Sequence, residues 1–176
     1  SDGLKNETIE IESKPDSNKI KLLNIRPDNN DVLPCVYYIH GGGMEIGSCF
    51  YKLYQAFGRL IAHQNVSVIM VDFRNARVPS SVPEVAPFPA GLNDCVSGFD
   101  YVKTNAKKLN IDSERIVISG ESGGGNLTLA TGMKLSQAGR SNEVKGLYAL
   151  CPYIAGIWPL PENPSSTENN GIMLDL

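Results

Sequence analysis

The sequence predicts an α/β protein in which crossover helices join the strands of a mostly parallel sheet. Short apolar runs, typical of buried strands, alternate with stretches of helical periodicity after an opening hairpin. Two of these runs lead directly into glycine-rich motifs, and open α/β sheets carry their ligand sites at such strand ends. The chain has 176 residues, 41% of them hydrophobic and 20% charged, which is enough for one domain with a sizeable core.

The expected elements follow one another along the chain. Thr8–Glu12 alternates apolar and polar residues like a half-buried strand, and a turn at 16–18 joins it to a second strand at Lys19–Ile25. Arg26–Asn30 is expected to be a loop. The later expected strands are Cys35–Ile39, Val66–Asp72, Arg115–Ser119 and Lys145–Leu150, and the expected helices are Tyr54–Gln64, Ala90–Lys108 and one that starts near Asn126.

Two further expectations concern the segments between these strands. In the first helix, Phe57, Leu60 and Ile61 share one face, which we expect to be the buried one. The proline-rich stretch Pro79–Pro89 is expected to be a surface loop.

The sequence GESGG at 120–124 carries the strongest functional signal. It follows the apolar run Arg115–Ser119 and precedes a helical stretch, so Ser122 lies at the apex of a strand–turn–helix. The tight turn needs neighbours without side chains, which Gly120 and Gly124 supply. Ser122 could instead be a helix N-cap, but the strand and the glycines would be superfluous for a cap. We predict that Ser122 is a nucleophile.

A second motif makes the prediction more specific. His40-Gly41-Gly42-Gly43 directly follows the expected strand Cys35–Ile39. Three successive glycines leave backbone N–H groups uncovered, and acyl transfer needs such donors to stabilise the oxyanion of its tetrahedral intermediate. A triple glycine by itself is also compatible with a flexible turn. Because both motifs lie at the carboxyl ends of parallel strands, we expect them to meet in space.

Together these motifs resemble those of the hormone-sensitive-lipase-like branch of the α/β-hydrolase esterases and lipases. Val68–Ala76 resembles the strand that ends in Asp-Tyr-Arg-Leu-Ala in that family, and Pro87–Asp94 resembles its Pro-Phe-Pro-Ala segment. Asn110–Ile116 resembles its approach to the nucleophile strand. Order and spacing agree from about Leu33 to Pro152. The resemblance implies an α/β-hydrolase fold and a serine carboxylesterase that hydrolyses short-chain acyl esters through an acyl-enzyme.

The resemblance also implies roles for individual residues. Gly42 and Gly43 correspond to the oxyanion-hole glycines of the family, and the N–H of Gly123 is the third donor. The family often has alanine at the position of Gly123. His40 orders the glycine-rich loop and is not the catalytic base. The small acyl-ester substrate is the expected ligand, and neither a metal nor an organic cofactor is needed.

The histidine content departs from the family pattern. The chain has two histidines, His40 and His63, and we expect His63 to be a surface residue. In this fold the triad runs Ser, Asp or Glu, then His, yet no histidine follows Ser122. We therefore expect residues 1–176 to be only the amino-terminal portion of a single catalytic domain, with an open sheet edge. A second polypeptide or a further segment would supply the acid and the base, and Pro159–Thr167 would be a protease-accessible loop.

Several other residues are candidates for supporting roles. Asp72 and Arg74 are expected to hydrogen-bond loops near the oxyanion segment, and Asp94 to be a structural helix residue. Glu121 flanks the nucleophile, but its side chain is expected to point away from the hydroxyl. Glu168 is expected near the pocket, and none of these positions suits the triad acid.

Two alternatives stay open at this stage. Met44 and Phe50 either line an acyl pocket or belong to the core. The protein is either an esterase or a non-catalytic ligand-binding protein on the same scaffold, which the missing histidine favours and the retained Ser122 disfavours.

Composition narrows the class of protein. The formal net charge of −3 and the pI of about 5.4, without clustered basic residues, argue against nucleic-acid binding. No apolar stretch reaches the length of a membrane span. The four cysteines are widely separated, which argues against a disulfide framework or metal site and favours a reducing, cytoplasmic location. Assembly into a homo-oligomer stays open.

Overall fold

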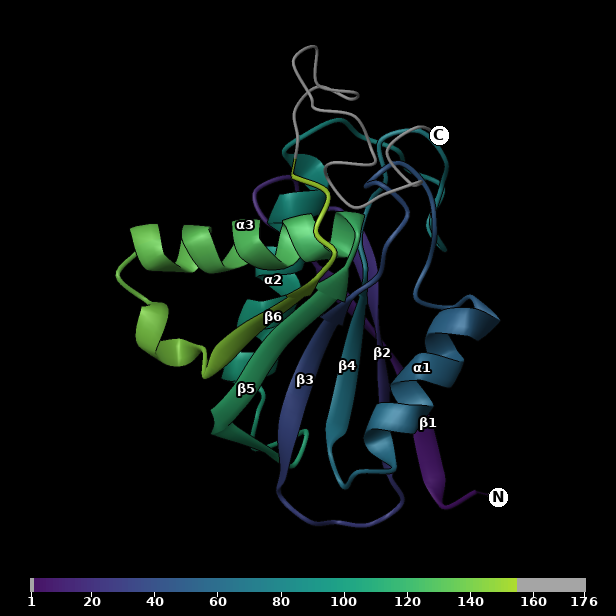
Figure 1. Ribbon diagram of the computed structural model, residues 1–176, viewed down its shortest axis with the longest axis vertical. Helices are drawn as coiled ribbons and strands as arrows, with labels where there is room; N and C mark the ends of the chain where they lie inside the picture. The colour runs from purple at the N-terminus through teal and green to yellow at the C-terminus, as the bar shows by residue number, and fades with distance from the viewer. Residues whose placement is uncertain (1, 155–176) are drawn as a thin grey trace, which may run out of the picture.

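The computed structural model describes residues 2–154, in which helices cover a six-stranded sheet (Figure 1). The strands are β1 (Leu4–Glu12), β2 (Lys19–Pro27), β3 (Leu33–Ile39), β4 (Ser67–Asp72), β5 (Ile111–Glu121) and β6 (Gly146–Leu150). The helices are α1 (Lys52–Ala62), α2 (Ala90–Thr104), α3 (Gly123–Gln137) and the short 3-10 helix η1 (Ser141–Glu143). Within this range no helix has the length and apolar character needed to cross a membrane.

The sheet has the order β1-β2-β4-β3-β5-β6. The hairpin β1–β2 is antiparallel and β2 is antiparallel to β4, whereas β4, β3, β5 and β6 run parallel to one another. This arrangement confirms the predicted mostly parallel sheet with crossover helices. It also places the ends of β3 and β5, which carry the two glycine-rich motifs, side by side at the top of the sheet in Figure 1.

The second strand extends further than the sequence suggested. Arg26, expected in a loop, belongs to β2 and is only 3% exposed. Its guanidinium donates hydrogen bonds to the carbonyl oxygens of Leu109 at 2.5 Å and Asp31 at 2.7 Å. A buried arginine needs such partners, and they hold the strand in register for two more residues.

Alternating side chains of the central strands build a core on each face of the sheet. Tyr37 and Ile39 point toward α2 and α3, whereas Tyr38, between them, belongs to the smaller cluster beneath α1. The buried hydroxyl of Tyr37 donates to the carbonyl oxygen of Cys95 in α2 at 2.8 Å. Burial of apolar side chains on both faces therefore fixes the direction in which β3 delivers the motif that follows it.

The buried face of α1 matches the predicted one only in part, since Ile61 packs against the core cluster beneath the helix. Phe57 and Leu60 are 40% and 67% exposed, whereas Gly58 and Ala62 are buried. A Cβ added to Gly58 would lie 2.8 Å from the sulfur of Met70, so the helix rests on the sheet through small residues. This close approach turns the larger apolar side chains toward the sides of the helix.

The edge strand β6 is incompletely covered. Leu147, Tyr148 and Leu150 are 43%, 59% and 47% exposed, although their strand pairs fully with β5. In Figure 1, α2 and α3 lie over one face of the sheet at this end, whereas α1 lies at the opposite end on the other face. The second face of β6 therefore has no helix over it within residues 2–154.

Candidate active site

Ser122 lies at the sharp turn between β5 and α3, with φ 54° and ψ −119°. A residue with a side chain rarely adopts this backbone conformation, and such strain collects at functional sites. The turn is held in place because the Ser122 amide donates to the carbonyl oxygen of Leu150 at 2.9 Å and its carbonyl accepts from the amide of Tyr153 at 3.0 Å. The Ser122 side chain makes no capping hydrogen bond, which argues against the helix N-cap alternative.

The turn at residues 120–124, called the elbow below, packs against the end of β3 because Gly124 has no side chain. A Cβ added there would overlap the carbonyl oxygen of Ile39 and lie 2.5 Å from that of His40. Gly120 is equally confined, since its Cβ would lie 2.7 Å from the same Ile39 oxygen. The predicted meeting of the two motifs is therefore present in the structure, and the glycines make it possible.

The oxyanion segment, residues 40–43, touches the elbow at Gly123. A Cβ added to Gly123 would lie 2.7 Å from the amide nitrogen of Gly43 and 2.8 Å from that of Met44. Gly42 and Gly43 have φ of 111° and 63°, in the left-handed region that glycine tolerates. Two backbone segments thus converge beside Ser122, where the sequence predicts the oxyanion donors.

His40 is completely buried and packs beneath this segment. Its ring stacks on Phe73 with 4.4 Å between ring centroids, and its Nδ1 lies 2.7 Å from the carbonyl oxygen of Gly41. Because a carbonyl can only accept, Nδ1 carries the proton. Burial lowers the pKa of His40 and so favours the neutral ring. These contacts support the predicted role of His40 in ordering the loop.

Asp72, at the end of β4, connects two loops as the sequence predicts. Its Oδ1 accepts hydrogen bonds from the hydroxyl of Ser48 at 2.6 Å and the amide of Cys49 at 3.0 Å, in the chain that follows the oxyanion segment. Its Oδ2 accepts from the amide of Ser81 at 2.8 Å. The carboxylate therefore fastens the loop after the oxyanion segment to the proline-rich loop.

Arg74 has partners other than the predicted ones. Its Nε and Nη2 form a two-pronged contact with the carboxylate of Asp94 in α2, each at 3.0 Å, and Nη2 also lies 2.9 Å from Asp16 in the β1–β2 turn. Asp94 is completely buried and also accepts from the hydroxyl of Ser13. The pair joins the hairpin, the end of β4 and α2, so Arg74 is part of the scaffold and Asp94 is structural, as predicted.

Glu121 directly contacts the oxyanion segment, a role that sequence reasoning missed. Its Oε1 accepts hydrogen bonds from the amide of Gly41 at 3.0 Å and from the hydroxyl of Tyr54 in α1 at 3.1 Å. The side chain therefore extends toward β3 and α1, in keeping with the prediction that it points away from the Ser122 hydroxyl. Tyr54 carries no recognisable motif, and only the packing of α1 brings it to Glu121.

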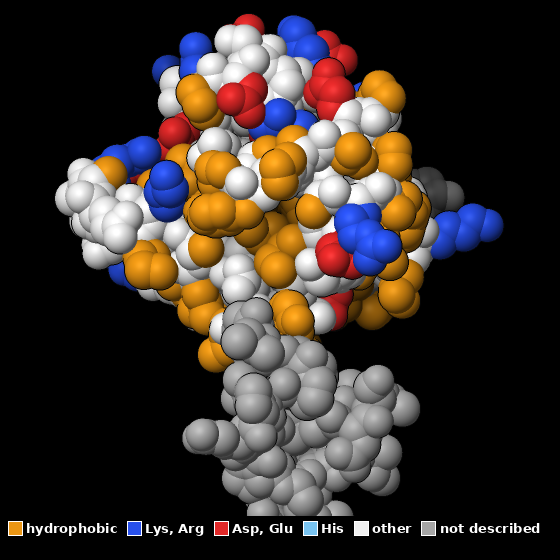
Figure 2. Space-filling model, turned by 90° about the horizontal axis from the view of Figure 1, so that it is seen from above, with side chains coloured by type: hydrophobic (Ala, Val, Ile, Leu, Met, Phe, Trp, Pro, Cys, Tyr) orange, Lys and Arg blue, Asp and Glu red, His pale blue; other side chains and the backbone are white. Residues whose placement is uncertain are grey.

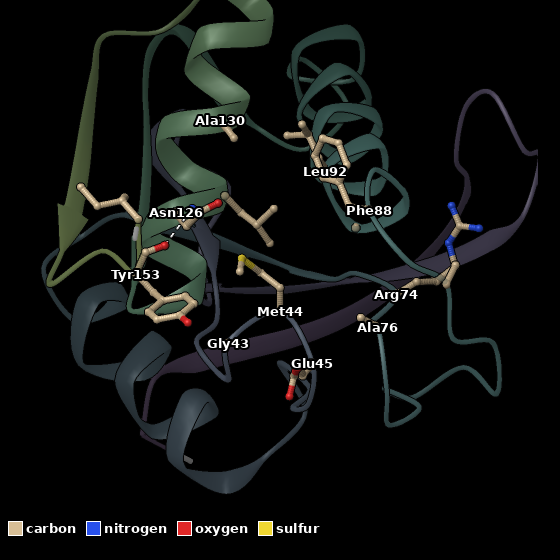
Figure 3. Close-up of a pocket in the computed structure, with 14 residues that line it drawn as sticks. Gly43, Met44, Glu45, Arg74, Ala76, Phe88, Leu92, Asn126, Ala130 and Tyr153 are labelled. Carbon is tan, nitrogen blue, oxygen red and sulfur yellow. Dashed lines mark hydrogen bonds between the residues drawn. The ribbon is translucent and has the colours of Figure 1, made fainter. Parts of the chain in front are cut away.

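A cavity of about 500 Å³ opens next to the oxyanion segment, between α2 and α3 (Figure 3). Its lining includes the polar residues Glu45, Arg74 and Asn126, and the Asn126 side chain donates to the carbonyl of Tyr153 at 2.8 Å. The rest of the lining is glycine or apolar: Gly43, Met44, Ala76, Ala86, Phe88, Gly91, Leu92, Leu127, Ala130, Tyr153 and Ile154. Seen from above the view of Figure 1, hydrophobic side chains gather over the middle of the molecule (Figure 2).

The structure places Met44 and Phe50 differently. Met44 lines the cavity and also packs against the main core cluster, whereas Phe50 packs against the core cluster beneath α1. Phe88 stands beside Leu92 in the cavity wall and is 82% exposed. The cavity thus has an apolar interior with an aromatic ring at its rim.

The other candidate residues lie away from Ser122 or outside the described range. The side chain of His63 is 46% exposed and lies 3.7 Å from Asp2, which confirms the predicted surface position. Glu168 and the loop Pro159–Thr167 lie outside the described residues. Cysteines 35, 49 and 95 are buried and Cys151 is exposed, all four as free thiols.

The elbow and the oxyanion segment agree with the family assigned by comparison. A family model described as "alpha/beta hydrolase fold" matches residues 36–175. This chain belongs to the α/β-hydrolase family. The matched range includes both glycine-rich motifs and all the residues that line the cavity.

The solved structures and relatives that the chain resembles include several esterases. It superposes on the esterase Est22 with a TM-score of 0.92 and 62% identity over 98% of this chain, and on brefeldin A esterase, a bacterial homologue of human hormone-sensitive lipase, with 0.80 and 36% over 89%. An arylesterase of Saccharolobus solfataricus is 31% identical over 86% of the chain, and carboxylesterase NlhH of Mycobacterium tuberculosis is 36% identical over 58%.

These relatives confirm the predicted resemblance to hormone-sensitive-lipase-like esterases. The chain spans 50% of the solved Est22 chain and 42% of the brefeldin A esterase chain. It likewise spans 45% of the arylesterase and 30% of the carboxylesterase.

Proposed function

We propose that the intact protein is a serine carboxylesterase that hydrolyses small acyl esters through an acyl-enzyme. The observation that carries this proposal is the contact between the nucleophile elbow and the oxyanion segment, where Gly123 lies against the amides of Gly43 and Met44. An N-cap serine or a flexible turn would need neither the strained backbone of Ser122 nor this approach.

The proposed reaction has two steps. The Ser122 hydroxyl loses its proton to a base while its oxygen forms a bond to the ester carbonyl carbon, and the carbonyl oxygen becomes an oxyanion. The amides of Gly42, Gly43 and Gly123 stabilise that oxyanion, and each such donor contributes roughly 10²- to 10³-fold in kcat. The ester C–O bond then breaks, and the alcohol leaves with the proton. Water attacks the acyl-enzyme in the same way and releases the acid.

We propose that the triad acid and the histidine base come from outside this sequence, on a second polypeptide or a further segment. Two observations support this. No histidine follows Ser122 in the 176 residues, and His40 and His63 are occupied elsewhere. The strand β6 exposes apolar side chains at the sheet edge, where further structure would pack.

The lining of the cavity is suited to a substrate with a small apolar group. Its walls are mostly aliphatic or aromatic, and it reaches the oxyanion segment at Gly43. Related proteins are described as an arylesterase and as an esterase solved with p-nitrophenol. We therefore expect short acyl esters of aromatic alcohols to be hydrolysed, with no metal or organic cofactor. The free cysteines fit a reducing, cytoplasmic compartment.

A fluorophosphonate probe tests this proposal in the intact protein. The expected result is covalent labelling of Ser122, located by peptide mass spectrometry, together with hydrolysis of p-nitrophenyl acetate. Ser122→Ala should abolish both while the fold persists, whereas His63→Gln at the surface should change neither. Ester hydrolysis that survives Ser122→Ala would refute Ser122 as the nucleophile. A folded protein with neither labelling nor hydrolysis would refute the proposal in favour of a binding protein.

A further inference from the structure

The carboxylate of Glu121 is positioned to act on the oxyanion segment through the backbone. Glu121 ends β5 and directly precedes Ser122, yet its Oε1 reaches across to the amide of Gly41 at 3.0 Å. Gly41 lies between the buried ring of His40 and the proposed donors Gly42 and Gly43. A hydrogen bond at Gly41 therefore restrains the chain at the point where it enters the oxyanion hole.

Gly41 leaves the space that this carboxylate occupies. A Cβ added there would overlap Oε1 of Glu121 and lie 2.7 Å from its carboxyl carbon. The carboxylate of Glu121 therefore docks directly against the backbone of Gly41.

Tyr54 holds the carboxylate from the other side. Its hydroxyl donates to the same Oε1 at 3.1 Å, and its ring lies 5.3 Å from the ring of His40. Partial burial and the neighbouring Glu121 raise the pKa of Tyr54 to about 12, so the hydroxyl keeps its proton at neutral pH. Tyr54 therefore touches both groups that hold the entrance of the oxyanion segment.

We propose that Glu121 and Tyr54 form a positioning pair that sets the oxyanion hole, with Tyr54 acting through Glu121. The inference rests on the proposed esterase function. Neither residue touches the reacting atoms. A carboxylate charge beside an oxyanion is unfavourable by Coulomb's law, so the benefit of Glu121 lies in the geometry that its hydrogen bonds impose.

Three variants of the intact protein test the pair by steady-state hydrolysis of p-nitrophenyl acetate. A hydrogen bond to a charged group is worth roughly 1.5–3 kcal/mol, so Glu121→Ala should lower kcat about 10- to 100-fold with KM within about twofold. Tyr54→Phe keeps the ring against His40 and should lower kcat about fivefold. Glu121→Gln keeps an acceptor oxygen for both donors and should recover kcat to within about threefold of wild type.

The double variant Glu121→Ala/Tyr54→Phe distinguishes a pair from two separate effects. Because Tyr54 acts through Glu121, its kcat should equal that of Glu121→Ala within about twofold, instead of showing multiplied losses. Glu114→Gln, at an exposed position of the same strand, and Tyr51→Phe, at an exposed position before α1, are matched controls and should behave as wild type.

The outcomes separate this inference from the proposed function. Wild-type protein without turnover and without Ser122 labelling would refute the esterase. An active wild type whose Tyr54→Phe and Glu121→Ala variants keep its kcat, even with lower melting temperatures, would show a merely structural role and overturn the pair. Multiplied losses in the double variant would also overturn it. If Glu121→Ala fails to fold, Tyr54→Phe and Glu121→Gln decide the question.

Discussion

At the scale of single residues, Gly123 is the point at which the elbow and the oxyanion segment touch. Gly123→Ala would place a Cβ 2.7 Å from the amide nitrogen of Gly43, closer than real Cβ atoms approach such a group. The backbone must then move, and a displacement of this order costs about 10- to 100-fold in rate. We expect that loss in kcat for p-nitrophenyl acetate.

The control for this substitution is Gly146→Ala. A Cβ at Gly146, at the start of β6, would meet nothing within 4 Å, so kcat should stay at the wild-type value. Wild-type kcat in Gly123→Ala would show that the oxyanion segment adapts to the alanine common in related esterases.

His40 makes the stability of the protein depend on pH. Burial lowers its pKa in the folded state below its ordinary value of 6.5. At pH values below 6.5 and above the folded-state pKa, the unfolded chain binds a proton that the folded protein does not. The free energy of unfolding therefore falls by up to about 1.4 kcal/mol for each unit by which the pH is lowered. Urea unfolding between pH 7.5 and 5.5 should show this fall. His40→Gln should flatten it, whereas exposed His63→Gln should leave it unchanged. An equal slope in all three would contradict the prediction.

Residue chemistry also explains how much of the site could be predicted. Ser122 and residues 40–43 could be recognised from the sequence because each motif is contiguous and needs its glycines for a local turn. The contact of Glu121 with Tyr54 joins positions 67 apart, and nothing in either segment marks it. It depends on how α1 sits on the sheet, which periodicity alone does not determine.

At the scale of elements, the same limit appears in α1. The helix was predictable from its apolar periodicity, but its buried face was predictable only in part, because Gly58 and Ala62 allow an approach that leaves Leu60 67% exposed. The strands were more predictable, since a run such as Cys35–Ile39 is apolar on both faces of a sheet covered from both sides. Only their ends differ, as at Arg26, where a buried side chain extends β2.

The buried ion pair of Arg74 and Asp94 holds three elements together, so its loss should be costly. Asp94→Ala leaves a guanidinium that is 7% exposed with one remaining carboxylate, Asp16, and should lower the free energy of unfolding by about 3–5 kcal/mol. Asp100→Ala removes a half-exposed partner of Arg140 and should cost about 1 kcal/mol or less. Urea denaturation measures both. Similar losses in the two variants would contradict a special role for the buried pair.

At the scale of the whole molecule, the sheet edge at β6 governs how the chain behaves in solution. Leu147, Tyr148 and Leu150 on the strand, with Leu129 and Met133 on α3, are each at least 38% exposed. An apolar edge strand of this kind offers both unpaired backbone groups and hydrophobic area to another chain. We expect residues 1–176, expressed alone, to self-associate at micromolar concentration in size-exclusion chromatography with light scattering.

Substitutions at the edge test this expectation directly. Tyr148→Lys/Leu150→Lys places two charges on the edge strand and should shift the protein toward the monomer, because like charges oppose pairing of two edges. Val32→Lys is the matched control: Val32 is also apolar and 61% exposed, but it precedes β3 outside this patch, and the variant should associate like wild type. A stable, well-folded monomer of the unaltered chain would contradict this expectation and show that β6 tolerates exposure. The exposed side chains of β6 would then no longer support the proposal that further structure packs at this edge.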